Sequence, residues 1–435
     1  MQHAWDLYRT AKAAQTTGDF ATVAASLRAC AALPEAERRD PRLGNACGWL
    51  IHHSAKYFLH LQPPHVRIVV ELLAISEAFS YDWQQEINPY SQLLRIAIKE
   101  RKDFPGFLAF VQGWDLRRLR EADFEPFQPP EGEAIPALAE QVWMAVAKHL
   151  IAGYDLQGRG PQAAPDPAAV EVFLPQIGAV IEAYPGYEYL PYLRAQLYLA
   201  LNQTEPALRD LLPFVRSHLH QYWAWDWLGR AYYRSGRREA ALACFSPGPR
   251  ERGPAPLTVL TPERYGRLCR ESGLNAEARA AMGDVIRLRR ETWGKLPARL
   301  ARLEQEAWFL SAGTPAPNQR AQLAHAATRY LYEDLPEALA VVTALHPGKG
   351  LAWYRLDRER TGNLPLREVE GDLAPGDLLH LRVQRRSGPS GDWYQTLTAR
   401  RATAPLPPAL ARTFEGTLTR PAGKNFGFVG RDFFV

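Results

Sequence analysis

Two phenylalanines near the end of the sequence have the spacing of a surface that stacks nucleic-acid bases. Phe426 and Phe428 alternate with Gly427 and Val429, so in a β-strand both rings would lie on one face of the sheet. Lysine and arginine flank this pair. Cations beside exposed aromatic rings are typical of single-strand binding, in which each stacked base contributes about 1–3 kcal/mol. The alternatives are that this face packs against a helical domain or forms the core of a barrel.

The charge distribution also favours a polyanionic partner for this part of the chain. The sequence carries 52 Lys and Arg against 47 Asp and Glu, a net charge of +5. Residues 349–435 hold 14 basic and 9 acidic residues, so the whole excess lies there and the remainder is balanced. A local positive excess is typical of nucleic-acid binding, although chance clustering of arginine would give the same count.

Patterns typical of enzymes and metal sites are not found. No phosphate-binding loop, dinucleotide-binding, nucleophile-elbow or HExxH motif occurs in the sequence. The histidines His52, His53, His60 and His65 lack a carboxylate at the spacing that a metal site requires. The four cysteines form no CxxC pair, which argues against structural zinc or a disulfide framework and fits a reducing cytoplasm. We therefore expect no catalytic residues, no cofactor and no metal.

Helical repeats are the first of the elements that must position the aromatic surface. Residues 225–245 contain a spaced set of large and small side chains: Trp225, Leu228, Gly229, Tyr232, Ala241 and Phe245. In order and spacing this set resembles the tetratricopeptide repeat. The resemblance implies two antiparallel helices that cross at the small residues, with large residues between them and Gly236 in the turn.

Shifting this pattern along the chain predicts neighbouring units. Residues 188–221 and 222–255 are adjacent repeats, with Asn202 at the first turn. A third unit follows, displaced by three residues, with Gly266, Gly273, Ala278 and Met282 in the small, turn, small and large positions. A fourth, fainter unit is expected at about 319–352, with Ala326, Ala338 and Val342. Near the N-terminus Ala11, Gly18 and Leu27 hold comparable positions.

These units predict an N-terminal helical domain over 1–155 with degenerate repeats and a repeat domain over 170–345. Stacked helix pairs bury a continuous core only against their neighbours, so we expect one curved solenoid with a concave groove. The groove would hold a protein or peptide partner. Trp223 and Trp227 are candidates to face it.

After residue 350 the pattern changes from helical periodicity to alternation. The stretches 351–360, 377–386 and 392–401 alternate apolar and polar residues and are separated by turn sequences, which predicts a β-rich, barrel-like module over 350–411. The expected fold class is therefore mostly α, a helix–turn–helix solenoid followed by a small β-barrel module.

Residues 412–435 resemble the first three strands of a cold-shock barrel, which is an OB-like fold. The matching residues are Gly416, Thr417, Lys424, Phe426, Gly427, Phe428, Val429, Asp432, Phe434 and Val435. The resemblance implies binding of single-stranded RNA or DNA, with Phe426, Phe428 and Phe434 stacking on bases and Arg420 and Lys424 contacting phosphates. The sequence departs from the family at Arg420 and Pro421, which replace an aromatic pair.

Two layouts of the β segment remain open. Either 350–411 is one barrel and 412–435 starts a second, or the two pieces close one barrel in permuted order. The first layout leaves an apolar strand edge at Phe433–Val435, which proteins normally avoid. We therefore expect either a truncated chain or an edge completed by another strand.

The expected function is that of a non-enzymatic cytoplasmic adaptor. The helical repeats would bind a protein partner and the OB/cold-shock-like module would bind single-stranded RNA or DNA, without a membrane. The combination resembles bacterial repeat proteins of stress response or defence. The alternative is a protein-binding scaffold whose β module is a structural cap or a dimerisation element.

Overall fold

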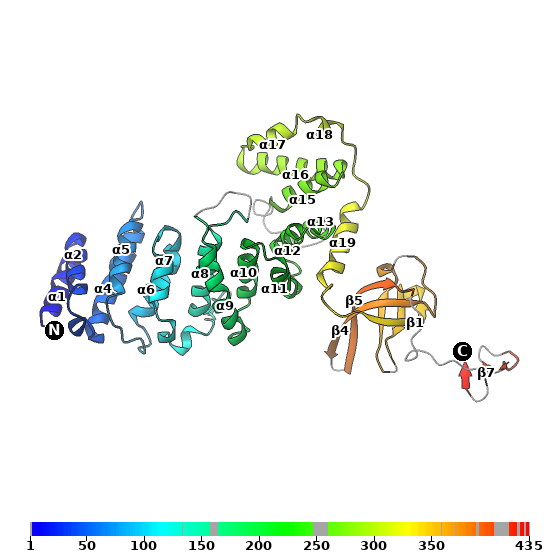
Figure 1. Ribbon diagram of the computed structural model, residues 1–435, viewed down its shortest axis with the longest axis horizontal. Helices are drawn as coiled ribbons and strands as arrows, with labels where there is room; N and C mark the ends of the chain where they lie inside the picture. Colours follow the sequence, from blue (N-terminus) through cyan, green and yellow to red (C-terminus); the bar gives the residue numbers. More distant parts are fainter. Residues whose placement is uncertain are drawn as a thin grey trace. The chain divides into compact units, whose positions relative to one another are not determined.

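The protein is mostly helical and carries a small closed β-barrel in its C-terminal part (Figure 1). The computed structural model describes residues 2–132, 134–156, 164–246, 260–357, 359–369, 371–388, 391–403, 417–423, 427–429 and 432–434. The chain divides into two compact units, Met1–Phe214 and Val215–Val435. The fold class expected from the sequence is confirmed at this level.

The first unit is an array of helices in which each packs on its neighbours in the chain. Helix α1 contacts α2 and α4, α4 contacts α5 and α6, α6 contacts α8, and α8 contacts α10. The bounds of the helices are α1 Gln2–Thr16, α2 Phe20–Ala31, α3 Glu35–Arg38, α4 Pro41–His60, α5 Val66–Ser76, α6 Pro89–Glu100, α7 Phe107–Gly113, α8 Leu138–Ile151, α9 Pro167–Ala183 and α10 Tyr189–Ala200, with α11 (Thr204–Ser217) reaching the second unit.

Three helices of the first unit begin with the same local signal. Asp40, Asn88 and Asp166 each cap a helix that starts with proline, and each side chain accepts a hydrogen bond from a backbone N–H in the first turn. Proline suits this position because its fixed φ is already helical and its missing N–H would have no partner there. The sequence thus sets where α4, α6 and α9 begin.

The second unit contains helix–turn–helix pairs with a recurring close contact. A Cβ on Gly229 would lie 2.6 Å from Phe245, and one on Gly266 would lie 2.9 Å from Met282. The turns within the pairs have positive φ at Gly236 and Gly273, as expected. The helices are α12 Tyr222–Arg234, α13 Arg238–Phe245, α15 Leu260–Glu271, α16 Asn275–Trp293, α17 Ala298–Leu303, α18 Ala307–Ser311 and α19 Gln319–Leu331.

The barrel is closed by five strands in the order β1-β2-β3-β5-β4. Neighbouring strands are antiparallel except β3 and β5, which run parallel, and β1 pairs with β4 to close the ring. Its core includes Ala340, Val342, Tyr354, Leu364 and Leu379. The strands are β1 Ala338–His346, β2 Leu351–Arg355, β3 Thr361–Pro365, β4 Leu378–Gly388 and β5 Gly391–Arg401.

The expected fourth helical unit at 319–352 is wrong in its second half. Helix α19 ends at Leu331, and Ala338 and Val342 lie in β1. The physical reason is pairing: β1 bonds to β2 on one side and to β4 on the other, and Ala340 and Val342 are buried in the barrel. Because β1 supplies the closing strand, the barrel closes without residues 412–435.

A separate three-stranded sheet lies in the last part of the chain. It has the order β6-β7-β8, with β6 Leu418–Thr419, β7 Gly427–Val429 and β8 Asp432–Phe434. In the described part of the chain, no helix is both long enough and apolar enough to span a bilayer.

Candidate nucleic-acid interface

The barrel places two tryptophans on its outer face. In β2, Ala352 and Tyr354 are buried while Trp353 is 40% exposed. In β5, Tyr394 packs against the core while Trp393 is 53% exposed. Each strand thus sends one aromatic ring inward and its neighbour outward, as alternation requires. Both outward rings keep exposed surface on which a ligand could stack, and that of Trp353 also meets His346 edge to face.

A row of polar side chains connects the two tryptophans across the barrel wall. Trp353 lies opposite Asn363 of β3, which lies opposite Gln395 of β5. Residues directly opposite each other share a face of the sheet, and Gln395 shares that face with Trp393 two residues earlier. Amide groups in such a row can donate to and accept from base edges.

The wall beneath this row is fixed by the buried hydroxyl of Tyr354. It lies 2.9 Å from Oγ1 of Thr396, which is 3.0 Å from the carbonyl oxygen of Asn363. Burial raises the pKa of Tyr354, so the hydroxyl stays protonated. A Cβ on Gly362 would lie 2.4 Å from this oxygen, so glycine is needed where β3 crosses Tyr354. These contacts tie β2, β3 and β5 together under the exposed side chains.

Three cations lie on the barrel strands and the turn near the tryptophans in the chain or in strand register. Lys349 lies between β1 and β2, Arg355 ends β2, and Arg386 lies opposite Trp393 on β4 and donates from Nε to Oε1 of Gln395 at 3.0 Å. Within the residues that the structure describes, none of the three makes an ion pair, whereas other barrel arginines do. The paired arginines are Arg360 with Asp357, Arg382 and Arg400 with Glu337, and Arg401 with Asp377.

The residues expected to bind nucleic acid at 412–435 are only partly described. Phe428 lies opposite Thr419 and Phe433, and Phe434 lies opposite Gly427, so both belong to paired strands. Arg420 follows β6 and is exposed. Lys424 and Phe426 lie outside the described residues. The sheet therefore brings the backbones of Phe428 and Phe434 together on neighbouring strands.

The tryptophans expected to face a helical groove lie in α12. Trp227 is 4% exposed, and the guanidinium of Arg230 lies 4.0 Å above its ring. Trp223 is half-buried, and its Nε1 donates to Oε1 of Gln221 at 3.0 Å. Trp227 therefore packs inside the unit, and only Trp223 retains exposed ring surface.

Sequence reasoning predicted the strands that carry Trp353 and Trp393 but did not select these residues. The available signal was the pair of aromatic dipeptides, Trp353-Tyr354 and Trp393-Tyr394. Alternation requires one ring of each pair to point outward. Which ring does so depends on the register of the barrel, which the dipeptides alone do not specify.

Comparison with known proteins identifies similarity in the helical part. A family model described as a domain of unknown function (DUF7017) matches residues 188–329. The matched range begins where the first adjacent repeat was expected and ends before the barrel. Among curated proteins, none matches the chain.

Proposed function

We propose that the protein is a non-enzymatic adaptor whose barrel binds single-stranded RNA or DNA and whose helical part holds a protein partner. The observation that carries the proposal is the outer barrel face, where Trp353 and Trp393 are exposed and where Lys349, Arg355 and Arg386 make no ion pair with a described residue. Aromatic platforms combined with a positive surface are how proteins hold single strands. A closed five-stranded barrel is also the architecture of OB-folds, which bind oligonucleotides on strands 2 and 3 and on adjoining loops.

The helical part supports the adaptor role through its repeated pairs. The glycine contacts at Gly229 and Gly266, together with the turns at Gly236 and Gly273, fit tetratricopeptide-like units. Such units stack to give extended surfaces for proteins. The C-terminal sheet resembles part of a cold-shock barrel. It would add a second surface for the same single-stranded nucleic acid.

Fluorescence polarisation with labelled single strands of about 15 nucleotides, in RNA and DNA form, tests the proposal. Trp353→Ala and Trp393→Ala should each weaken binding by about 5- to 150-fold, the equivalent of 1–3 kcal/mol per stacked base. Trp293→Ala is the matched control, because this ring is 45% exposed in the helical part. Undetectable binding at low salt, or equal affinities for all three variants, would exclude the barrel face.

One observation favours the alternative, a barrel that acts as a structural cap. Nε of Arg382 donates to the carbonyl oxygen of Leu335 at 2.9 Å, just beyond the end of α19. Glu337 then pairs with both Arg382 and Arg400. These contacts fasten the barrel to the segment that connects it with α19. Under this alternative, Arg382→Ala would loosen the barrel while the tryptophan variants would leave every binding measurement unchanged.

A further inference from the structure

A short hairpin in the first unit exposes large apolar side chains. Phe127 and Ile135 pair through two backbone hydrogen bonds, with N···O distances of 2.9 and 2.8 Å. The paired residues share one face, and their side chains are 61% and 44% exposed. Exposed apolar groups that gather in one place usually mark an interaction site.

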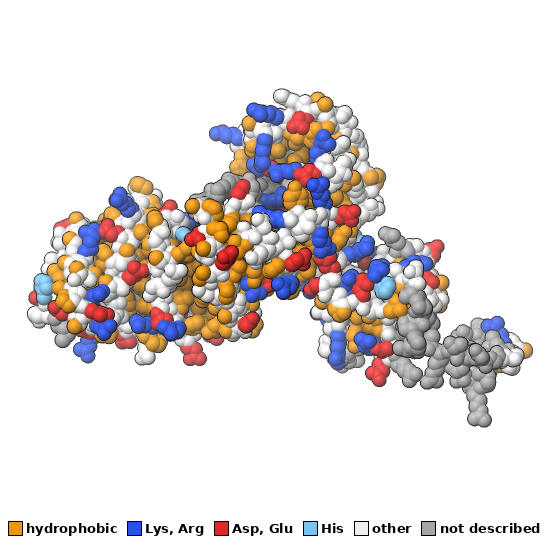
Figure 2. Space-filling view, viewed as in Figure 1, with side chains coloured by type: hydrophobic (Ala, Val, Ile, Leu, Met, Phe, Trp, Pro, Cys, Tyr) orange, Lys and Arg blue, Asp and Glu red, His pale blue; other side chains and the backbone are white. Residues whose placement is uncertain are grey.

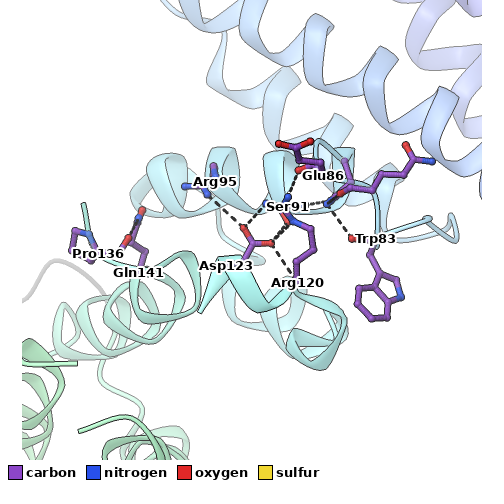
Figure 3. A network of polar contacts seen from close by, with 10 residues as sticks. Trp83, Glu86, Ser91, Arg95, Arg120, Asp123, Pro136 and Gln141 are labelled. Carbon is purple, nitrogen blue, oxygen red and sulfur yellow. Dashed lines mark hydrogen bonds and ion pairs between the residues drawn. The ribbon is translucent and has the colours of Figure 1, made fainter. Parts of the chain in front are cut away.

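The hairpin is held in place from its first strand by a buried carboxylate. Asp123 is 2% exposed and accepts hydrogen bonds from Oγ of Ser91 at 2.8 Å and from Nε of Arg120 at 3.2 Å (Figure 3). Arg95 lies 3.7 Å from the same carboxylate, and Arg120 also donates to the carbonyl oxygen of Glu86. The segment that enters the hairpin is therefore fixed to α6 and to the loop before it.

The second strand of the hairpin is fastened as well, and further contacts hold Phe124 at the start of the first. Nε2 of Gln141, on α8, donates to the carbonyl oxygen of Pro136 at 2.7 Å (Figure 3). The hydroxyl of Tyr187 donates to the carbonyl oxygen of Phe124 at 2.9 Å. The ring of Phe124 stacks on Tyr184, which stacks on Tyr187. Both ends are thus anchored while Phe127 and Ile135 stay exposed, so the structure pre-organises these two side chains in solvent.

The exposed ionisable side chains of the hairpin and of the turn that enters it are acidic, while Arg95 and Arg120 pair with the buried Asp123 at its base. Residues 121–147 contain six acidic residues and no Lys or Arg. Glu121, Glu125 and Glu131 are exposed, and none of them makes an ion pair with another described residue. Figure 2 shows apolar and acidic side chains together over α8–α10, with Lys and Arg along the lower edge of the same unit. The exposed glutamates Glu121, Glu125 and Glu131 favour a cationic partner over a nucleic acid.

We propose that the hairpin built on the Phe127–Ile135 pair docks a basic segment of a partner protein, in which Lys or Arg residues flank an apolar side chain. The apolar side chain packs on Phe127 and Ile135, and the flanking cations face Glu121, Glu125 and Glu131. The proposal deepens the proposed adaptor function by naming the chemistry of the protein partner. It does not depend on nucleic-acid binding by the barrel.

Selection of displayed random 12-residue peptides on the full-length chain tests the proposal. We expect enriched peptides that combine Lys or Arg with Leu, Ile or Phe, and at least tenfold weaker binding of a synthesised winner to Phe127→Ser/Ile135→Ser. Glu121→Gln/Glu125→Gln/Glu131→Gln should weaken binding at low salt and leave it nearly unchanged at high salt. Leu310→Ser is the matched control, since this apolar side chain is 65% exposed elsewhere.

Oligonucleotide binding measured on the same variants separates this proposal from the proposed function of the barrel. Hairpin variants should retain wild-type affinity for single strands, so a barrel that binds nothing leaves the peptide result valid. No enrichment, enrichment of peptides without basic residues, or equal binding by the hairpin and control variants would overturn the proposal. Sedimentation of the wild type as a dimer and of Phe127→Ser/Ile135→Ser as a monomer would assign the surface to a second copy instead.

Discussion

Gly229 of α12 lies against the ring of Phe245 of α13, so closely that a Cβ would come within 2.6 Å of Cε1 and 2.7 Å of Cδ1. Gly266 and Met282 repeat the relationship in the next helix pair, again sixteen residues apart. A small residue on one helix and a large one on the other therefore set how closely each pair packs.

Gly229→Ala should destabilise the second unit by about 1–3 kcal/mol, because the extra methyl overpacks the helix crossing. Gly283→Ala is the matched control, since nothing lies within 4 Å of a Cβ at that helical position. There the higher helix propensity of alanine should stabilise the helix by up to about 1 kcal/mol. Hydrogen exchange within α12 and α16 reports each change locally. Equal stabilisation by both substitutions would contradict the contact.

Glu263→Gln should destabilise the same unit by about 3 kcal/mol, because Arg289 would lose the charge that compensates its burial. Glu263 is 3% exposed and lies near Arg267, Arg289 and Arg299 at 3.4, 3.4 and 2.6 Å. Chemical denaturation measures the effect. Glu304→Gln removes a more exposed partner, that of Arg290, and should change the free energy of unfolding by less than about 1 kcal/mol. A similar loss in both variants would argue against a special role of the buried carboxylate.

Glu140→Gln should stabilise the first unit at pH 8 and leave its stability nearly unchanged at pH 4. Burial, with a smaller effect of Glu188, raises the pKa of Glu140 to about 7. Between its usual pKa and this value the folded chain binds more protons than the unfolded chain, so stability falls as pH rises and is lowest above pH 7. Glutamine stays neutral, so above pH 7 the substitution should raise the free energy of unfolding by an amount on the order of 3 kcal/mol. Denaturation at both pH values checks this, with exposed Glu205→Gln as the control.

Arg355→Ala and Arg386→Ala should each weaken single-strand binding at all sequences tested and reduce its salt dependence. For single strands, each lost phosphate contact lowers the slope of log K against log salt concentration by about 0.7. Polarisation titrations at several salt concentrations give this slope. Arg287→Ala removes a mostly exposed arginine of α16 and should leave the slope as it is. An unchanged slope in the barrel variants would show that these arginines do not meet phosphates.

The helix–turn–helix units could be predicted because their signals are local. Gly18, Asn202, Gly236 and Gly273 were expected in turns, and all four have positive φ, a conformation that few other residues adopt. Strand β1 could not be recognised in this way. Its three alanines favour a helix, and of its two partners only β2 is near in sequence, while β4 begins about forty residues later. Pairing on both sides in the closed barrel explains why it is extended.

The candidate nucleic-acid face could not be predicted from the sequence for a related reason. Alternation alone shows that one ring in each aromatic dipeptide points outward, but the register changes within the sheet between Val342 and Ala344 and between Arg382 and Val383. Such irregularities reverse which residues face the core. The row from Trp353 through Asn363 to Gln395 depends on three strands whose pairing the sequence does not display.

The parallel pairing of β3 with β5 has a consequence for synthesis of the chain. Gly362 and Asn363 meet Tyr394 and Gln395, so β3 keeps an open edge until the ribosome has added the last barrel strand. The preceding helix pairs need only contacts with nearby residues, and local contacts form earlier than distant ones. We therefore expect closure of the barrel to follow folding of the preceding helix pairs during translation.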